Sequence, residues 1–161
     1  MIREMLPWVK LTARRRDFLA EREKVNLHED AFMEKVGTDC SAAEKKVVLA
    51  LRRVIAKDCG IPPEKLDPSE SKLLLASLMG GDGFWGFLLC GPYGFDFWSI
   101  FSNLIMHELP KEFKQLPNIK PRQLQALGSF LNEASGFSDW IRDAARQVVS
   151  VMQQKGYSFS A

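Results

Sequence analysis

The chain has 161 residues, of which 46% are hydrophobic and 26% are charged, and 22 Lys and Arg face 20 Asp and Glu for a formal charge of +2. This length and composition suit one globular domain and lie far from the low-hydrophobicity, high-charge profile of a disordered protein. So small a net charge does not by itself indicate a nucleic-acid partner.

The cysteines and the apolar stretches indicate the cellular compartment in which the protein is expected. Cys40, Cys59 and Cys90 form no CxxC pair, so we expect reduced, mostly buried thiols rather than a disulfide framework or a zinc site. The first ten residues lack the apolar core of a signal peptide, and acids and glycines break residues 73–107 into runs too short for a membrane helix. We therefore expect a cytoplasmic protein with no membrane partner.

The N-terminal region from Thr12 to Lys35 is charge-rich and has helical propensity. Its apolar period is imperfect, which allows one helix or two, and we favour two, broken near residues 26–28. Arg14, Arg15 and Arg16 would suit a nucleic-acid or lipid contact, but the acids that follow dilute the patch, so a solvated helix face is the default interpretation. A small helical nucleic-acid-binding regulator stays open as an alternative.

The clearest element is a helix over residues 41–59. Ser41 and Glu44 form a capping box, and apolar residues recur at three- and four-residue spacing, with Arg52 and Arg53 expected on the solvent face. Gly60 suits the left-handed position after a helix, and the prolines at 62 and 63 forbid continuation.

The middle of the chain interleaves glycines with aromatic residues between positions 79 and 101, so this part is either helical or an irregular insert. Residues 97–109 favour a helix, with its apolar face at Trp98, Phe101, Ile105 and Leu109. His107 and Glu108 begin like a zinc-protease motif, but the second histidine is absent, so no metal site is expected.

Two more helices are predicted towards the C-terminus. Pro121 suits a first helical position, and Leu124, Leu127, Leu131 and Ala134 form a stripe over one helix. Ser138 is expected to cap a last helix that stops at Gly156.

Residues 41–78 carry a resemblance to a known family. A helix ends in a Gly60–Ile61 step, a short polar stretch leads to the apolar Leu66 and the small polar Ser71, and an apolar helix follows over residues 73–78. This order resembles the first helix and long loop of acyl carrier proteins, and Phe137–Ile141 is similar to the start of that family's last helix. The resemblance implies an all-α, acyl-carrier-like helical bundle over residues 41–161, preceded by an N-terminal helical extension over residues 1–40, within one compact domain.

The resemblance also implies where a cofactor would sit. Working carriers hold phosphopantetheine on the serine of an Asp-Ser-Leu triplet at a helix start, where free amides stabilise the phosphate. At the equivalent place this chain has Asp82 followed by a glycine, and in a second register Asp96 is followed by Phe97. The remaining candidates for attachment are Ser77 and Ser99.

We therefore expect a non-enzymatic, degenerate carrier-like protein of the kind found in bacteria, without a cofactor, which acts by binding a protein partner or a second copy of itself. The expected contact residues are Asp82, Phe84, Trp85, Phe87, Asp96, Phe97 and Trp98. A genuine carrier modified at Ser77 or Ser99 is the alternative. No acid–base pair, activated nucleophile or metal set can be assembled from the sequence, so no catalytic residue is expected.

Overall fold

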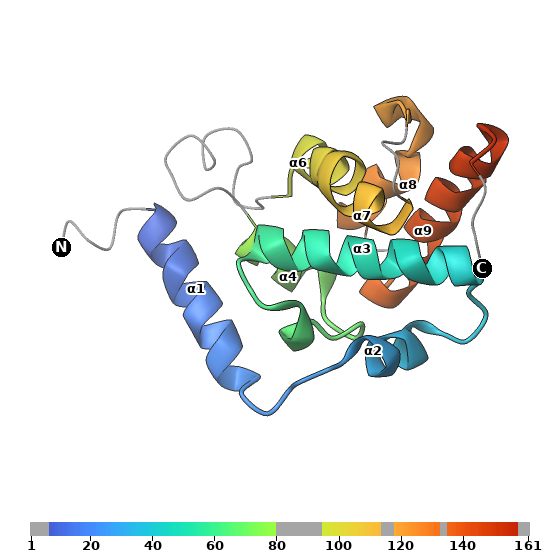
Figure 1. Ribbon diagram of the computed structural model, residues 1–161. Coiled ribbons are helices and arrows are strands. Elements are labelled where there is room, and N and C mark those ends of the chain that lie inside the picture. Colours follow the sequence, from blue (N-terminus) through green and yellow to red (C-terminus); the bar gives the residue numbers. More distant parts are fainter. Residues whose placement is uncertain (1–6, 80–94, 114–117, 133–134, 158–161) are drawn as a thin grey trace.

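The computed structural model describes residues 7–79, 95–113, 118–132 and 135–157, with side chains from residue 11 onward (Figure 1). The regular structure in these ranges is entirely helical, which confirms the all-α prediction. In the same ranges, no helix combines the length and the apolar character needed to cross a bilayer.

The elements, in chain order, are the following. The α-helices are α1 (Pro7–Glu21), α2 (Glu29–Val36), α3 (Ala42–Cys59), α4 (Lys72–Leu78), α6 (Phe97–Asn103), α7 (Leu109–Phe113), α8 (Gln125–Gly128) and α9 (Phe137–Gln154). They are joined by 3₁₀ turns η2 (Pro63–Lys65), η4 (Pro121–Gln123) and η5 (Ser129–Leu131) and by a π turn, η3 (Leu104–Glu108). The break between α1 and α2 confirms the prediction of two N-terminal helices.

Helix α3 runs through the middle of the molecule and contacts α4, α6, α7 and α9 (Figure 1). Both halves of its predicted capping box are present: the Glu44 amide donates to Ser41 Oγ (3.2 Å) and the Ser41 amide donates to Glu44 Oε2 (3.0 Å). Gly60 ends the helix in the left-handed conformation, with φ of 66°. The caps are therefore set by local sequence alone.

The solvent face expected for α3 was wrong at Arg52. This side chain is buried, with its guanidinium carbon 4.2 Å from the centre of the Phe32 ring and its Nη2 donating to the Leu27 carbonyl (2.6 Å). The reason is tertiary: α2 and the segment before it lie along this side of α3, and Arg52 offers a carbonyl partner and a cation–π contact there. Arg53 does lie nearer the surface.

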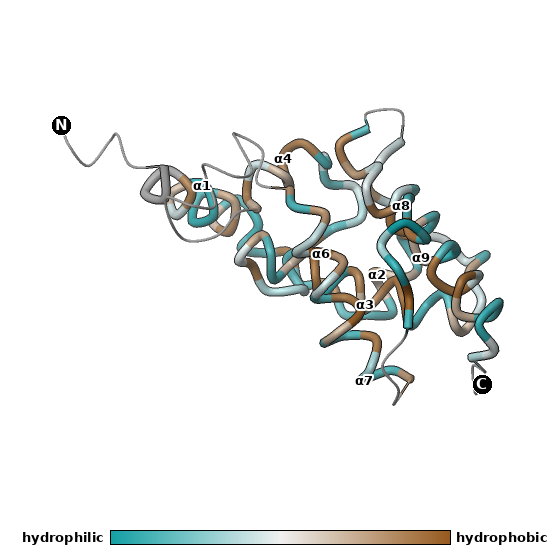
Figure 2. Tube along the Cα trace, turned by 90° about the horizontal axis from the view of Figure 1, so that it is seen from above, coloured by the Kyte–Doolittle hydropathy of each residue, from teal (hydrophilic) through white to brown (hydrophobic). Residues whose placement is uncertain are grey.

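The core extends into the region before residue 41. Phe32 and Val36 of α2 are buried with the side chains of α3 and α9, and α2 contacts α9 directly. Helix α9 contributes the largest buried side chain, Trp140. Figure 2 shows the corresponding distribution, with hydrophobic segments of α3, α6 and α9 facing one another. Residues 29–36 thus belong to the same core as the bundle.

The single helix predicted from Pro121 was wrong. The chain forms η4, α8 and η5 instead, Leu131 is exposed, and Ala134 lies outside the described residues. Side chains of α9 compete for the backbone here: Trp140 Nε1 donates to the Ala126 carbonyl (2.9 Å), and the Ala126 amide donates to Gln147 Oε1 (2.8 Å). Backbone groups held in this way are not available to a continuous helix.

The start of the last helix was also misplaced. Helix α9 begins at Phe137 with Gly136 as N-cap, and the Ser138 hydroxyl donates to the Val36 carbonyl (3.4 Å) instead of capping the helix. The stop is as predicted, because Gly156 has a positive φ of 81°.

The helix predicted over residues 97–109 is present, and its predicted apolar face is buried at Ile105 and Leu109 but not at Trp98. Trp98 is 65% exposed, and Ile100 and Leu104 are buried as well. The helix continues through the π turn into α7, and the π turn ends two residues before Pro110, whose ring would clash with the carbonyl four residues earlier in a regular α-helix. The extra residue of the π turn shifts the helical faces, which a regular period does not anticipate.

Candidate functional site

Three of the predicted contact residues, Asp96, Phe97 and Trp98, lie at the start of α6, where Asp96 is the N-cap. Asp96 Oδ1 accepts a hydrogen bond from the Trp98 amide (2.9 Å), so a helix does begin at Asp96 with Phe97 as its first residue. The four other predicted contact residues, Asp82, Phe84, Trp85 and Phe87, lie outside the described residues.

Three aromatic side chains on α6, Phe97, Trp98 and Phe101, form what we call the aromatic ridge. The Phe97 ring lies 5.8 Å from that of Trp98 in an edge arrangement and 5.9 Å from that of Phe101. Phe97 and Phe101 are partly buried against the core, whereas Trp98 projects from it. Because Phe97 packs against the core and against the rings of both Trp98 and Phe101, the ridge is a packed surface feature rather than one isolated side chain.

Neighbouring residues attach the ridge to the bundle. Phe95 stacks on the buried Phe130, with ring centres 4.9 Å apart and planes inclined by 4°. Phe97 lies against α8, where a Cβ added at Gly128 would meet the Phe97 ring at 3.8 Å. The aromatic residues of this region thus divide between core and surface, which their sequence order does not reveal.

Ser99 lies on the inner side of α6, facing α3. Its hydroxyl donates to Asp58 Oδ1 (3.3 Å) and accepts from Asn103 Nδ2 (3.4 Å). Burial raises the pKa of the Asp58 carboxyl above its ordinary value, and the hydrogen bond from Ser99 opposes part of that shift. This hydroxyl therefore helps to satisfy a half-buried carboxylate between two packed helices.

Ser77 lies in the last turn of α4. Its hydroxyl donates to the Leu74 carbonyl (2.6 Å), and its own carbonyl accepts from Arg14 Nη1 (3.2 Å). A helix end of this polarity presents carbonyl oxygens rather than amides, so its backbone offers a phosphate no donors, although the Arg14 guanidinium is close. Modification at either serine stays a prediction.

Arg15 has a role that the sequence did not suggest. It reaches from α1 to the C-terminal ends of two helices, where Nε donates to the Leu78 carbonyl (3.0 Å) and Nη2 to the Asp58 carbonyl (3.2 Å). The guanidinium lies over Gly60, so close that a Cβ there would be 2.7 Å from the Arg15 Cζ. The arginine triplet is thus partly an intramolecular cap, while Arg16 remains on the surface beside Asp17.

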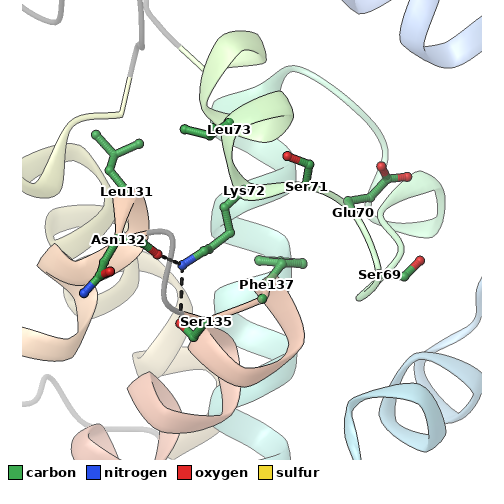
Figure 3. Close-up of a pocket in the computed structure, with 10 residues that line it drawn as sticks. Ser69, Glu70, Ser71, Lys72, Leu73, Leu131, Asn132, Ser135 and Phe137 are labelled. Carbon is green, nitrogen blue, oxygen red and sulfur yellow. Dashed lines mark hydrogen bonds between the residues drawn. The ribbon is translucent and has the colours of Figure 1, made fainter.

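A hollow of about 360 Å³ opens where α4, η5 and the start of α9 meet (Figure 3). Lys72 reaches into it from α4 and donates to the Asn132 carbonyl and to Ser135 Oγ (3.3 Å). Leu73 and Leu131 form its apolar rim. No sequence pattern predicts this hollow, because its lining comes from two groups of residues, 69–73 and 131–137, that are distant along the chain.

Catalytic and metal-binding groups are sparse in the described ranges. No group of three or more His, Cys, Asp and Glu side chains there could hold a metal ion. Glu108 forms ion pairs with Arg53 (2.7 Å) and Lys111 (3.0 Å), and His107 points to solvent. Burial raises the pKa of the Cys59 thiol strongly, which makes it a poor nucleophile.

No family model, curated protein or solved structure matches this chain. Its function is therefore argued from the geometry of its own surface.

Proposed function

We propose that this protein is a non-enzymatic binding module that docks an apolar segment of a protein partner on the aromatic ridge of α6. The observation that carries the proposal is Trp98, a large aromatic side chain that is 65% exposed at the start of a well-packed helix. Aromatic anchors of this kind supply much of the binding energy at protein interfaces.

The energy available at Trp98 is adequate for recognition. A tryptophan buries about 150–250 Å² when it is fully covered, so the 65% that is exposed corresponds to roughly 100–160 Å². At about 25 cal/mol per Å², covering that area contributes about 2.5–4 kcal/mol. Removing the side chain should therefore weaken a complex centred on it by about two to three orders of magnitude.

The chemistry of the ridge indicates the chemistry of the partner. Residues 97–106 include no charged side chain, and the charge next to the ridge is Asp96, whose carboxylate accepts from the Trp98 amide. A charged partner surface would lose its hydration over the three aromatic side chains without gaining an ion pair from them, so the expected occupant is an apolar segment. The same α6 residues are fixed by a capped helix start, which lowers the ordering cost of binding.

Peptide selection tests this proposal without knowledge of the partner. A random peptide library is selected on the wild type, and the enriched peptides are titrated against Trp98→Ala and against Leu74→Ala, which truncates a comparably apolar exposed side chain on α4. We expect peptides rich in Leu, Met and aromatic residues that lose at least tenfold in affinity with Trp98→Ala and little with Leu74→Ala. Equal affinity for all three proteins, or no enrichment, would refute the proposal.

A second copy of the chain is the competing occupant. Sedimentation equilibrium at high micromolar concentration measures it, since a dimer held by the ridge would dissociate with Trp98→Ala. A wild-type dimer that Trp98→Ala separates would replace the foreign partner by a homodimer.

A second candidate function is that of a true carrier modified at Ser99. The observation in its favour is that Ser99 lies in the first turn of α6, where backbone amides are not used by the helix. Co-expression with a broad-specificity phosphopantetheinyl transferase and measurement of the intact mass decides this. An unchanged intact mass would show that neither Ser99 nor Ser77 is modified, and would refute the carrier function.

A further inference from the structure

A cavity smaller than the hollow beside Lys72 lies where residues 27–29, which lead into α2, and the turn η2 meet the same side of α3 (Figure 1). It measures about 150 Å³, well below the size of pockets that hold drug-sized molecules, so it suits a ligand of only a few heavy atoms. Its walls come from residues 27–29, Leu49, Arg52, Arg53, Pro63 and Glu64, and the structure describes all of them.

Arg52 brings a buried positive charge to this cavity. The residue is 2% exposed, and in the described ranges its guanidinium makes one hydrogen bond, from Nη2 to the Leu27 carbonyl (2.6 Å). The Phe32 ring covers one face of the guanidinium, with 4.2 Å between the ring centre and Cζ. A guanidinium has five N–H donors, so most of those on Arg52 have no acceptor among the described residues.

The remaining nitrogens of Arg52 differ in their access to the cavity. Nε is buried and has no hydrogen-bond partner in the described part of the chain. Nη1 also makes no hydrogen bond to a described residue, but it is not closed off from solvent as Nε is, and Arg52 forms part of the cavity wall. A charged donor that is removed from water without an acceptor destabilises the fold. An acceptor bound in the cavity would therefore remove part of that cost.

The carboxylates around Arg52 do not neutralise it. Burial lowers the pKa of its guanidinium, and the nearby carboxylates, Glu64 first, oppose that shift only in part. Arg53, the other arginine of the lining, pairs with three carboxylates, among them Glu29 (3.5 Å). Glu64 is exposed at the cavity and forms no ion pair with a described residue. The buried guanidinium thus lies beside one loosely placed carboxylate and is not held by it.

The cavity walls and the shape of the guanidinium define the ligand. Parallel N–H donors of an arginine match the two oxygens of a carboxylate, which is why the pair is often bidentate. Leu27, Leu49 and Pro63 add apolar wall, which gains from contact with a short hydrocarbon. A free phosphate would place a more strongly hydrated charge against the same apolar side chains.

From these features we propose that the cavity binds a short-chain aliphatic carboxylate, with its oxygens on the Arg52 guanidinium and its hydrocarbon against Leu27, Leu49 and Pro63. Glu64 opposes binding, because its negative charge acts on the same guanidinium. The site shares no residue with the aromatic ridge of α6, so this proposal and the proposed docking function are tested separately.

The test compares a carboxylate with its neutral amide. Sodium propionate, propionamide and sodium phosphate are each titrated into the full chain at constant ionic strength and followed by amide chemical shifts. We expect propionate to saturate at millimolar concentration and to shift the amides of residues 27–29, 49–53 and 64–65. Propionamide and phosphate should each bind more weakly than propionate, by about fivefold or more.

Variants at the cavity separate charge from folding. Arg52→Met removes the guanidinium, and propionate binding should be lost, but the substitution also changes the core. Glu64→Gln removes the opposing charge at an exposed position, whereas Glu34→Gln removes the same charge from an exposed position on α2 outside the lining. Propionate affinity should be about three- to tenfold higher for Glu64→Gln than for Glu34→Gln.

The absence of saturable propionate binding would overturn the inference, because water alone would then fill the cavity. Binding of propionamide or phosphate as tight as that of propionate would overturn it too, as would equal propionate affinity for Glu64→Gln and Glu34→Gln. Retained binding by a folded Arg52→Met, or shifts confined to residues outside the lining, would have the same consequence.

Discussion

The contact between Gly60 and Arg15 yields the sharpest test of how this fold is held together. Gly60 has φ of 66°, a conformation in which any other L-residue costs about 1–2 kcal/mol. A Cβ at this position would also lie 2.7 Å from the Arg15 Cζ, so the guanidinium would have to leave. Gly60→Ala therefore combines backbone strain with the loss of a tertiary contact.

The free-energy cost of losing the Arg15 contact can be calculated from the two hydrogen bonds that Arg15 makes to the Leu78 and Asp58 carbonyls. At about 0.5–1.5 kcal/mol for each, the loss of both would add about 1–3 kcal/mol, which is an upper limit because the flexible end of Arg15 can shift. The total for Gly60→Ala is then at most about 5 kcal/mol and at least the backbone cost, measured as the loss of free energy of unfolding in urea.

Gly156→Ala is the matched control. Gly156 also has a positive φ, 81°, but a Cβ there would meet nothing within 4 Å, so only the backbone cost of about 1–2 kcal/mol applies. In an Arg15→Ala background, Gly60→Ala should cost no more than this control, because the clash has already been removed. Additive effects of Gly60→Ala and Arg15→Ala would refute the account of Arg15 as a cap over Gly60.

Three further outcomes follow from other contacts. Arg52→Ala should destabilise the protein by about 2–4 kcal/mol in urea unfolding, because it removes the packing on Phe32. Arg52→Met should cost about half as much, because methionine keeps most of that packing and leaves no buried guanidinium, a group whose pKa burial lowers. Burial alone would raise the pKa of Glu108, but hydrogen bonds from Arg53 and Lys111 outweigh it and hold the pKa below its ordinary value of 4.5. The stabilisation from Glu108 is then complete above pH 4.5 and is lost as the pH falls through the lowered pKa. The difference in free energy of unfolding between wild type and Glu108→Gln should therefore be largest near pH 7 and shrink below pH 4.5. A difference that stays constant with pH would contradict this account. Gly128→Ala should raise the free energy of unfolding by about 0.4–1 kcal/mol, since the helical backbone accepts alanine and the added Cβ meets the Phe97 ring at an ordinary 3.8 Å. A lower free energy of unfolding would show that the contact between α6 and α8 is tighter than this.

The elements that could be predicted from the sequence are those whose ends are fixed by neighbouring residues. The capping box at Ser41, the left-handed Gly60 and the stop at Gly156 each act within a few positions of the chain, and all three are present. The break between α1 and α2 was foreseen for the same reason, because the apolar period failed there. Local chemistry is enough wherever a helix satisfies its own ends.

Most of the errors involve contacts between distant segments. Helical period places Arg52 on the surface, but α2 covers that side of α3 and buries it. The region after Pro121 has a helical stripe, but Trp140 and Gln147 take the backbone groups of Ala126. Trp98 was assigned to the buried stripe because a regular period cannot include a π turn.

The candidate site could be predicted only in part for the same reason. Asp96 as a helix start follows from the sequence and is present, whereas of the two aromatic residues predicted beside it Trp98 is exposed and Phe97 is partly buried. Which aromatic side chains point outward depends on α8 and η5, since Phe95 stacks on Phe130 of η5 and the Phe97 ring lies beside Gly128 of α8. The hollow around Lys72 depends wholly on tertiary proximity.

A recurring feature of the fold is a cation that donates to main-chain carbonyls of a distant segment. Lys65 shows it most fully, because its Nζ donates to the carbonyls of Arg22 (3.2 Å), Glu23 (2.9 Å) and Val25 (2.7 Å), just after α1 ends. The path of residues 23–25, between α1 and α2, is thereby held through backbone carbonyls.

Every residue type carries a carbonyl, so most substitutions between residues 23 and 26 would leave the acceptors for Lys65 unchanged. The donor has no such freedom, since replacing or acylating Lys65 removes a positive charge that three carbonyls share. Among natural variants of this chain, we would therefore expect the segment to drift freely in sequence while the lysine that holds it does not.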